Sequence, residues 1–317
     1  PMNGMTSKLR SCSTEVDWED EMLRGKKPEQ TTPRLKLLMS GKAGVGKTTA
    51  AIQMPRPYLI DCEHGADHYG EQIERAGGLV YQCSSPDDLI QEVRAFVSES
   101  HKFLTLIVDP FTIVYDQEVE TGERKRGTEW GAHHQYAAKW AKRLMQLLRT
   151  VDSNVIITTH SKTEYAIRQN QKGKDEMVAV GETFDGYKKL DYVFDLWLRL
   201  YYDEQDRSKR IAEAAKTRLA AFPPGDRFVW SYQAVAERYG QDKLEGKVTP
   251  VVLATAEHVK RFTDLYDRLN SDEIKRLKID KVIDSADGIA DLPDARCLSG
   301  IEVLERYFDD GAKKSPF

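Results

Sequence analysis

The residues with the clearest chemical potential form a glycine-rich segment near position 45. Gly41-Lys42-Ala43-Gly44-Val45-Gly46-Lys47-Thr48 has the spacing Gly-x-x-x-x-Gly-Lys-Thr. Glycines let backbone amides turn toward phosphate groups, the lysine supplies a point charge, and the threonine hydroxyl can ligate magnesium. The segment therefore predicts a site for ATP and Mg²⁺. The expected phosphate-binding residues are Gly41, Lys42, Ala43, Gly44, Val45, Gly46, Lys47, Thr48 and Thr49.

Two acidic residues are candidates for the chemistry around those phosphates. Asp109 ends an apolar strand, which places it at the carboxyl edge of a sheet, so Thr48 and Asp109 are the expected magnesium ligands. The residue directly after Asp109 is Pro110, whose side chain cannot accept a proton as a glutamate at that position could. A catalytic base must therefore come from elsewhere. Glu63 lies just past another strand, at the same edge, where a carboxylate can deprotonate the attacking water. A capping or loop-stabilising role for Glu63 is the alternative.

His160 directly follows a third strand and is expected to point into the same cleft. A polar group there can sense the γ-phosphate and pass its presence to the following loop. A purely structural role is the alternative.

Short apolar strands that alternate with helices must position these residues, a pattern typical of a parallel sheet covered on both faces. A helix is expected after Ser85, a longer one over Thr128–Val151, and an antiparallel hairpin from Phe194–Leu200 and Arg210–Leu219. The expected parallel strands are Leu35–Met39, Tyr58–Asp61, Leu79–Cys83, Phe103–Asp109 and Asn154–Thr159.

The chain divides into three parts by composition. Residues 1–33 are polar and predict a flexible arm, residues 34–232 form an α/β ATPase core, and residues 233–317 form a small C-terminal helical region. In that last part, the pattern from about Val251 onward is that of amphipathic helices, with one apolar face that includes Val259, Phe262 and Leu265.

Composition excludes several classes of protein. No apolar run reaches the roughly 18 residues of a membrane helix, so we expect no membrane partner and a cytoplasmic protein. Four cysteines lie far apart, which argues against a disulfide framework. With 47 basic and 51 acidic side chains, any nucleic-acid site must be a local patch.

At this point the chain resembles the RecA family, and more narrowly the AAA-type phage RecA-core ATPases grouped with single-strand annealing proteins. The stretch from Leu59 to Asp67 resembles the segment that carries the RecA catalytic glutamate, which carries over onto Glu63. Asp109 takes the place of the second acid, and His160 stands where RecA has a glutamine. Lys216 and Arg218 match two cations that reach the ATP of the neighbouring subunit. The resemblance implies a RecA-like core and a homo-oligomeric ring or filament with ATP at subunit interfaces.

The same resemblance implies single-stranded DNA as a partner. Two segments, Gln117–His134 and the stretch from His160 to Lys189, correspond to DNA-binding loops. Cations among aromatic residues suit a single strand, whose phosphates are neutralised and whose bases stack. The candidate DNA-binding residues are Arg124, Lys125, Arg126, Lys162, Arg168, Lys172 and Lys174.

The sequence thus predicts a DNA-stimulated ATPase that promotes annealing or strand pairing during phage recombination, with a phage single-strand-binding or annealing protein as a further partner, in the host cytoplasm. A motor or regulatory ATPase acting on a protein, such as a helicase loader, is the first alternative. A small-molecule P-loop kinase is the second, and no acceptor pocket is identifiable for it.

Overall fold

The computed structural model describes residues 33–169, 175–277, 279 and 286–313. Residues 1–32, which make up nearly all of the predicted N-terminal arm, lie outside the described residues, as do Lys172 and Lys174.

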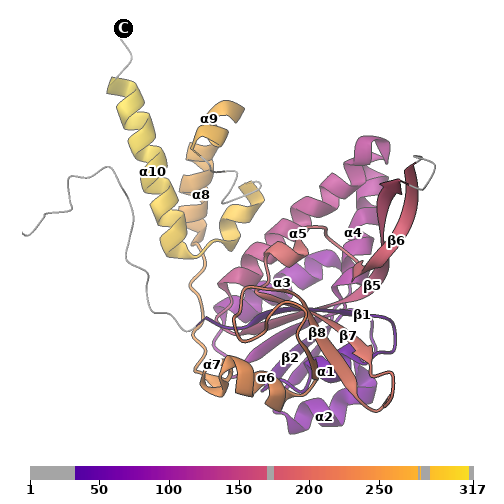
Figure 1. The fold of residues 1–317 in the computed structure, drawn as a ribbon. Helices are drawn as coiled ribbons and strands as arrows, with labels where there is room; N and C mark the ends of the chain where they lie inside the picture. The colour runs from indigo at the N-terminus through magenta and orange to yellow at the C-terminus, as the bar shows by residue number, and fades with distance from the viewer. Residues whose placement is uncertain (1–32, 170–174, 278, 280–285, 314–317) are drawn as a thin grey trace, which may run out of the picture. The chain divides into compact units, whose positions relative to one another are not determined.

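The nine strands of the described residues form one sheet in the order β3-β2-β4-β5-β1-β7-β8-β9, with β6 paired to β5 (Figure 1). Strands β3 to β7 in this order run parallel, while β8, β9 and β6 are antiparallel to their neighbours. The bounds are β1 (Lys36–Gly41), β2 (Pro57–Asp61), β3 (Leu79–Gln82), β4 (Thr105–Asp109), β5 (Asn154–Gln169), β6 (Asp175–Phe184), β7 (Leu196–Tyr202), β8 (Arg210–Thr217) and β9 (Arg227–Val229). The α/β fold with a mainly parallel sheet, its five predicted parallel strands and the β7–β8 hairpin are confirmed.

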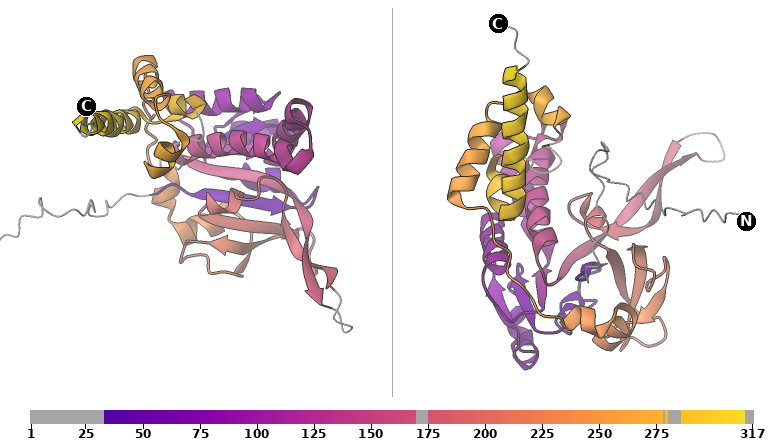
Figure 2. Two further views of the ribbon diagram at one scale, coloured as in Figure 1. Left: turned by 90° about the horizontal axis from the view of Figure 1, so that it is seen from above. Right: turned by 90° about the vertical axis from the view of Figure 1, so that its left-hand side faces the viewer.

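Helices cover both faces of the sheet, as Figures 1 and 2 show. One face carries α3, α4 and α5, and the other carries α1, α2, α6 and α7. The helical segments are α1 (Lys47–Ala51), η2 (Ala66–Tyr69), α2 (Gly70–Arg75), α3 (Pro86–Ser98), α4 (Phe111–Arg126), η3 (Glu129–Gly131), α5 (Ala132–Thr150), η4 (Leu190–Tyr192), α6 (Tyr232–Tyr239), α7 (Gln241–Glu245), α8 (Ala256–Tyr266), α9 (Ser271–Arg276), η6 (Ala286–Asp291) and α10 (Asp294–Lys313).

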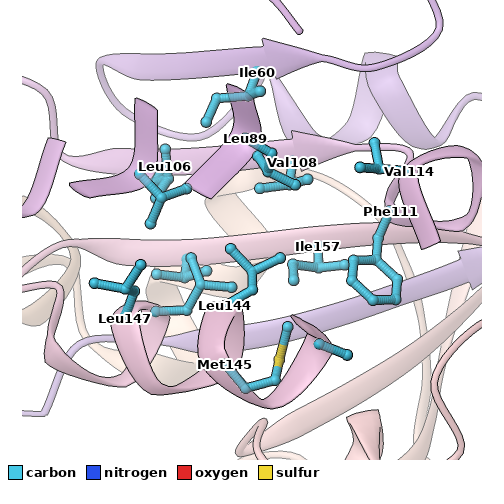
Figure 3. Packing of buried hydrophobic residues seen from close by; sticks show 14 of the residues in the cluster. Ile60, Leu89, Leu106, Val108, Phe111, Val114, Leu144, Met145, Leu147 and Ile157 are labelled. Atoms are coloured by element: carbon cyan, nitrogen blue, oxygen red, sulfur yellow. The ribbon is translucent and has the colours of Figure 1, made fainter. Parts of the chain in front are cut away.

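The side chains of each central strand point alternately to the two faces of the sheet and so contribute to two hydrophobic cores. Leu38 packs toward α3, α4 and α5, while its neighbours Leu37 and Met39 pack on the opposite face, because successive side chains of a strand point to opposite sides. Figure 3 shows the first of these cores, which includes Val108 of the sheet and Leu144 of α5. Continuous apolar strands are what a sheet buried on both faces requires. The strand ends that carry polar residues are thereby held by two packed layers.

Helix α3 begins as predicted, because the Ser85 hydroxyl accepts a hydrogen bond from the Asp88 amide at 3.2 Å and Pro86 occupies the first turn. The longer predicted helix starts later than Thr128. Trp130 and Gly131 have left-handed φ values of 53° and 73°, so α5 begins only at Ala132. The stripe of Ala137, Trp140, Leu144, Leu147, Leu148 and Val151 is buried core, as expected.

The two segments predicted as DNA loops have regular structure, which corrects that prediction. Most of Gln117–His134 is the second half of α4 and the start of α5. Within α4, Gly122 allows close packing on α5, since a Cβ there would lie 2.7 Å from the His133 carbonyl oxygen. The second segment is largely the β5–β6 hairpin, whose paired strands extend past Gly41 and beyond the rest of the sheet (Figure 1).

The C-terminal helices have a core of their own. Phe262, Leu269 and Ile301 are buried in it, and the predicted face of α8 packs against it. Helices α6 and α7 contribute side chains to the hydrophobic core of the ATPase domain, whereas α8 contributes to the C-terminal core. The division between these two cores therefore lies between α7 and α8 and not at residue 233. Asp291 has no exposed surface and forms ion pairs with Arg94 of α3 and Arg143 of α5, which ties η6 to the core. In the part of the chain that is described, no helix is both long and apolar enough to cross a bilayer.

Candidate functional site

The glycine-rich segment connects β1 to α1 in a tight loop. Gly44 and Gly46 have φ values of 76° and 87°, a left-handed conformation that residues with a Cβ rarely adopt. Gly46 is also the N-cap of α1, so the loop's amides lead directly into the positive end of that helix. The loop has the conformational requirements that the sequence spacing predicted.

Lys47 lies beneath this loop and is 8% exposed. Its Nζ donates hydrogen bonds to the carbonyl oxygens of Gly41 at 3.0 Å and Lys42 at 3.2 Å. Burial lowers the pKa of the ammonium, against the opposing attraction of Asp109 and Glu63. In the part of the chain that the structure describes, Lys47 Nζ thus has carbonyl oxygens of the loop as its hydrogen-bond partners, and Asp109 and Glu63 attract its charge.

Asp109 ends β4 and is 6% exposed. Its Oδ2 accepts a hydrogen bond from Thr48 at 2.5 Å, and its Oδ1 accepts one from Thr158 of β5. Burial raises the pKa of the carboxyl, although Thr158, Thr48 and Lys47 all act to lower it. Thr158 was not identified from the sequence, and its position inside an apolar strand offered little signal.

The pKa values of Lys47 and Asp109 are shifted in the directions opposite to those that an ion pair between them would produce. Mutual attraction raises the pKa of a lysine and lowers that of an aspartate, whereas Lys47 and Asp109 show the reverse because burial outweighs attraction. A polyphosphate beside Lys47 and a divalent cation beside Asp109 and Thr48 would supply the missing charges. The residues therefore fit ATP and Mg²⁺.

Glu63 follows β2 at the same edge of the sheet, and its side chain is exposed toward the site. Asp61, which is 3% exposed, accepts hydrogen bonds from the amides of Glu63 at 3.1 Å and Ala66 at 2.8 Å. These bonds set the path of the loop that carries Glu63. Asp61 was missed in the sequence, where its position two residues before Glu63 was the available signal.

His160 is in register with Gly41 across the β1–β5 pair, so it reaches the same edge of the sheet. Its amide donates to the Thr112 hydroxyl at 3.0 Å, and that hydroxyl donates to the Asp185 carbonyl at 2.9 Å. Asp185 directly follows β6 and pairs with Lys162 at 2.8 Å. The Thr112 hydroxyl thus connects the backbone of His160, beside the glycine-rich loop, to the backbone of Asp185 at the base of the β5–β6 hairpin.

One cavity of about 330 Å³ brings most of these residues together. Lys47, Thr48, Glu63, Asp109 and His160 all line it. The first four lie at or just after the ends of β1, β2 and β4, whereas His160 lies within β5, which continues past the predicted end at Thr159 to Gln169. Its full lining is Ala43, Gly44, Gly46, Lys47, Thr48, Thr49, Asp61, Glu63, Gly65, Ala66, Tyr69, Asp109, Pro110, His160 and Arg210.

Lys216 and Arg218 lie at the opposite edge of the sheet. Lys216 donates to the Phe194 carbonyl, and Arg218 donates to the Tyr192 carbonyl at 2.6 Å and pairs with Asp195 at 3.6 Å. β8 runs from the loop at Arg210 to this edge, so a separation of eight residues corresponds to roughly 25 Å of extended strand. Neither cation can reach the glycine-rich loop of its own subunit.

The candidate DNA-binding residues fall at two places. Arg124, Lys125 and Arg126 form the exposed last turn of α4, where Lys125 donates to the Tyr136 hydroxyl at 2.8 Å. Lys162 and Arg168 lie on β5 within the hairpin.

Strand β5 lies between β1, which enters the glycine-rich loop, and β4, which ends in Asp109. This arrangement carries the lysine and the acid to one cavity from strands that are not neighbours. A parallel sheet with this loop and this acid defines a P-loop NTPase core.

Comparison with protein families agrees with that class. Residues 34–230 match the family model AAA_24, described as an AAA domain. The match covers more than half of the chain, so the chain belongs to this family and carries an AAA-type ATPase domain. Among curated proteins, no match to the chain is found.

Proposed function

We propose that this protein is a Mg²⁺-dependent ATPase that works as a homo-oligomer and binds single-stranded DNA to promote annealing or strand pairing. The observation that carries the ATPase part is the single cavity in which Lys47, Thr48, Asp109 and Glu63 converge. The family match supports the same activity. The oligomer and the DNA partner rest on the RecA resemblance and on the placement of the cations.

In this mechanism the loop amides and Lys47 bind and orient the phosphates. Thr48 and Asp109 would hold a magnesium ion, which would supply positive charge beside the phosphates. Glu63 accepts the proton of a water molecule whose oxygen bonds to the γ-phosphorus. The bond from that phosphorus to the bridging oxygen breaks, and ADP leaves with the bonding pair. Asp61 keeps the Glu63 loop in place through its two amide contacts.

Lys47→Ala is expected to weaken binding of Mg-ATP by about 100-fold, or about 2.8 kcal/mol. The reason is that the variant lacks the Lys47 ammonium, which the Gly41 carbonyl holds beneath the loop. Isothermal titration calorimetry measures this change. Lys102→Ala, which alters an exposed lysine outside the cavity, is the matched control and should bind like the wild type. Unchanged affinity in a folded Lys47→Ala variant would remove the phosphate-binding assignment.

Neutralising Lys162, Arg168, Lys172 and Lys174 together is expected to weaken binding of single-stranded DNA and flatten its dependence on salt. Each lost phosphate contact lowers the slope of log affinity against log salt by about 0.7. Fluorescence anisotropy with labelled oligonucleotide across a salt series gives the slope, and ATP affinity is the control. An unaltered slope would exclude the hairpin from the DNA site.

A protein partner is the second candidate, and the hairpin itself favours it. Tyr165, Ile167 and Met177 are 59%, 71% and 69% exposed, and Ile167 is directly opposite Met177 across the strands. Residues two apart on a strand share a face, so Tyr165 lies on the same side. An apolar surface of this kind is typical of protein contacts. ATPase stimulation by single-stranded DNA separates the two candidates, because a regulator of a protein partner gains nothing from DNA alone.

A further inference from the structure

The end of the β7–β8 hairpin nearest the nucleotide site contacts the glycine-rich loop at two successive residues. The Tyr202 hydroxyl donates to the Gly44 carbonyl at 2.8 Å, and Arg210 Nε donates to the Val45 carbonyl at 3.0 Å. Tyr202 and Arg210 are directly paired across the two strands. The hairpin therefore holds the outside of the loop through side chains that the sequence analysis did not single out.

The Arg210 guanidinium lies against Gly46. A Cβ added to Gly46 would be 2.2 Å from Arg210 Nε, 2.7 Å from Nη2 and 2.8 Å from Cζ, so the planar group occupies the space that any side chain would need. Arg210 also lines the 330 Å³ cavity together with Lys47 and Thr49. A fixed cation thus faces the nucleotide site in the same subunit.

The position along the loop indicates which phosphates this cation meets. In a loop of this spacing the backbone amides cradle the α- and β-phosphates, while the lysine reaches the β- and γ-phosphates. Gly46 belongs to the amide cradle, whereas the proposed mechanism assigns Glu63 to the attacking water and Asp109 to the magnesium ion. Arg210 therefore lies at the α,β part of the site.

The donors of Arg210 are suited to such a contact. Nε is used by Val45, and among the described residues the structure gives no hydrogen-bond acceptor for the two Nη groups. A guanidinium offers five N–H donors in a planar fork that matches phosphate oxygens. The two remaining groups are therefore available to a ligand in the cavity.

We propose that Arg210 is a second phosphate-binding cation, acting in the subunit that holds the nucleotide, and that it contacts the α- and β-phosphates. This inference rests on the proposed ATPase function and names a further binding residue of that site. Because ADP and ATP share these phosphates, loss of the contact weakens both ligands equally and leaves the rate at saturation largely intact.

The test measures dissociation constants of Mg-ADP and of a non-hydrolysable ATP analogue for Arg210→Ala and Arg210→Gln. Both variants are expected to bind both ligands about 10- to 100-fold more weakly, the effect of a lost charge-assisted hydrogen bond. Glutamine keeps a donor for the Val45 carbonyl but has no charge. Wild-type affinity in Arg210→Gln would show that Arg210 only braces the loop, and a loss confined to the ATP analogue would place it on the γ-phosphate. Either result overturns the inference.

Arg207→Ala is the matched control. Arg207 lies in the turn of the same hairpin and lines a second cavity, of about 630 Å³, and not the 330 Å³ cavity that holds Lys47 and Thr48, so its removal should leave both affinities unchanged. Comparison with Lys47→Ala distinguishes a failure of the Arg210 inference from a failure of the proposed ATPase function. If Lys47→Ala loses nucleotide and Arg210→Gln does not, only the inference fails. If neither variant loses nucleotide, the site itself is misassigned.

Discussion

Arg218→Ala is expected to lower the ATP turnover number by about 10³-fold and to change the affinity for ATP far less. This is the expected result if Arg218 completes the ATP site of a neighbouring subunit, because cations of this kind contribute about 10³ to 10⁵ in rate. The variant keeps its own Lys47 and loop, which lie at the far end of β8. A steady-state phosphate-release assay gives the rate, and calorimetry gives the affinity.

The position of Arg218 makes this test sharp. Among the described residues of its own subunit, its guanidinium donates to the Tyr192 carbonyl and pairs with Asp195, at the edge of the sheet opposite the loop. A direct effect on the chemistry must therefore come from another copy of the chain. Arg75→Ala is the matched control, since Arg75 is an exposed arginine paired with Glu71 on α2.

Mixing two inactive variants distinguishes an action between subunits from a local defect. An Arg218→Ala subunit keeps a working Lys47, and a Lys47→Ala subunit keeps a working Arg218. One kind of interface in the mixed assembly then combines both intact halves, so activity should return. Absence of recovery in a mixture shown to co-assemble would exclude Arg218 as a trans-acting residue.

Glu63→Gln is expected to bind ATP with normal affinity and to hydrolyse it about 10²- to 10⁴-fold more slowly. The amide can still hold a water molecule through hydrogen bonds, but it cannot take the proton. The backbone amide of Glu63 donates a hydrogen bond to the Asp61 carboxylate. Because this contact does not use the Glu63 side chain, the substitution leaves it in place. Single-turnover hydrolysis measures the chemical step directly.

The control for this variant is Glu71→Gln, which alters an exposed glutamate on the nearby helix α2. It should retain the wild-type rate. A Glu63→Gln variant that turns over normally would assign the base to another group in the cavity.

Much of this site could be predicted from the sequence because its parts are local patterns. The glycine spacing, the apolar strand before Asp109 and the position of Glu63 after β2 each depend on a few adjacent residues. Parallel strands bring their carboxyl ends to one edge, so the convergence of these groups followed from strand order alone.

The residues that were missed depend on contacts between distant parts of the chain. Arg210 meets Val45 across 165 positions, and Tyr202 meets Gly44 across 158. No local spacing encodes those pairs. The end of α4 was predicted as a loop only because the RecA resemblance places a DNA-binding loop there, whereas packing on α5 stabilises this segment as a helix.

The buried charges of Lys47 and Asp109 bear on any effort to make a more heat-resistant protein. Both groups are buried where uncharged side chains of similar size would avoid a desolvation cost, and ligand binding alone makes them worth that cost. Selection for thermal endurance without nucleotide will therefore act against the two residues on which the chemistry depends. Directed evolution of this chain needs nucleotide retention as a second criterion at every round.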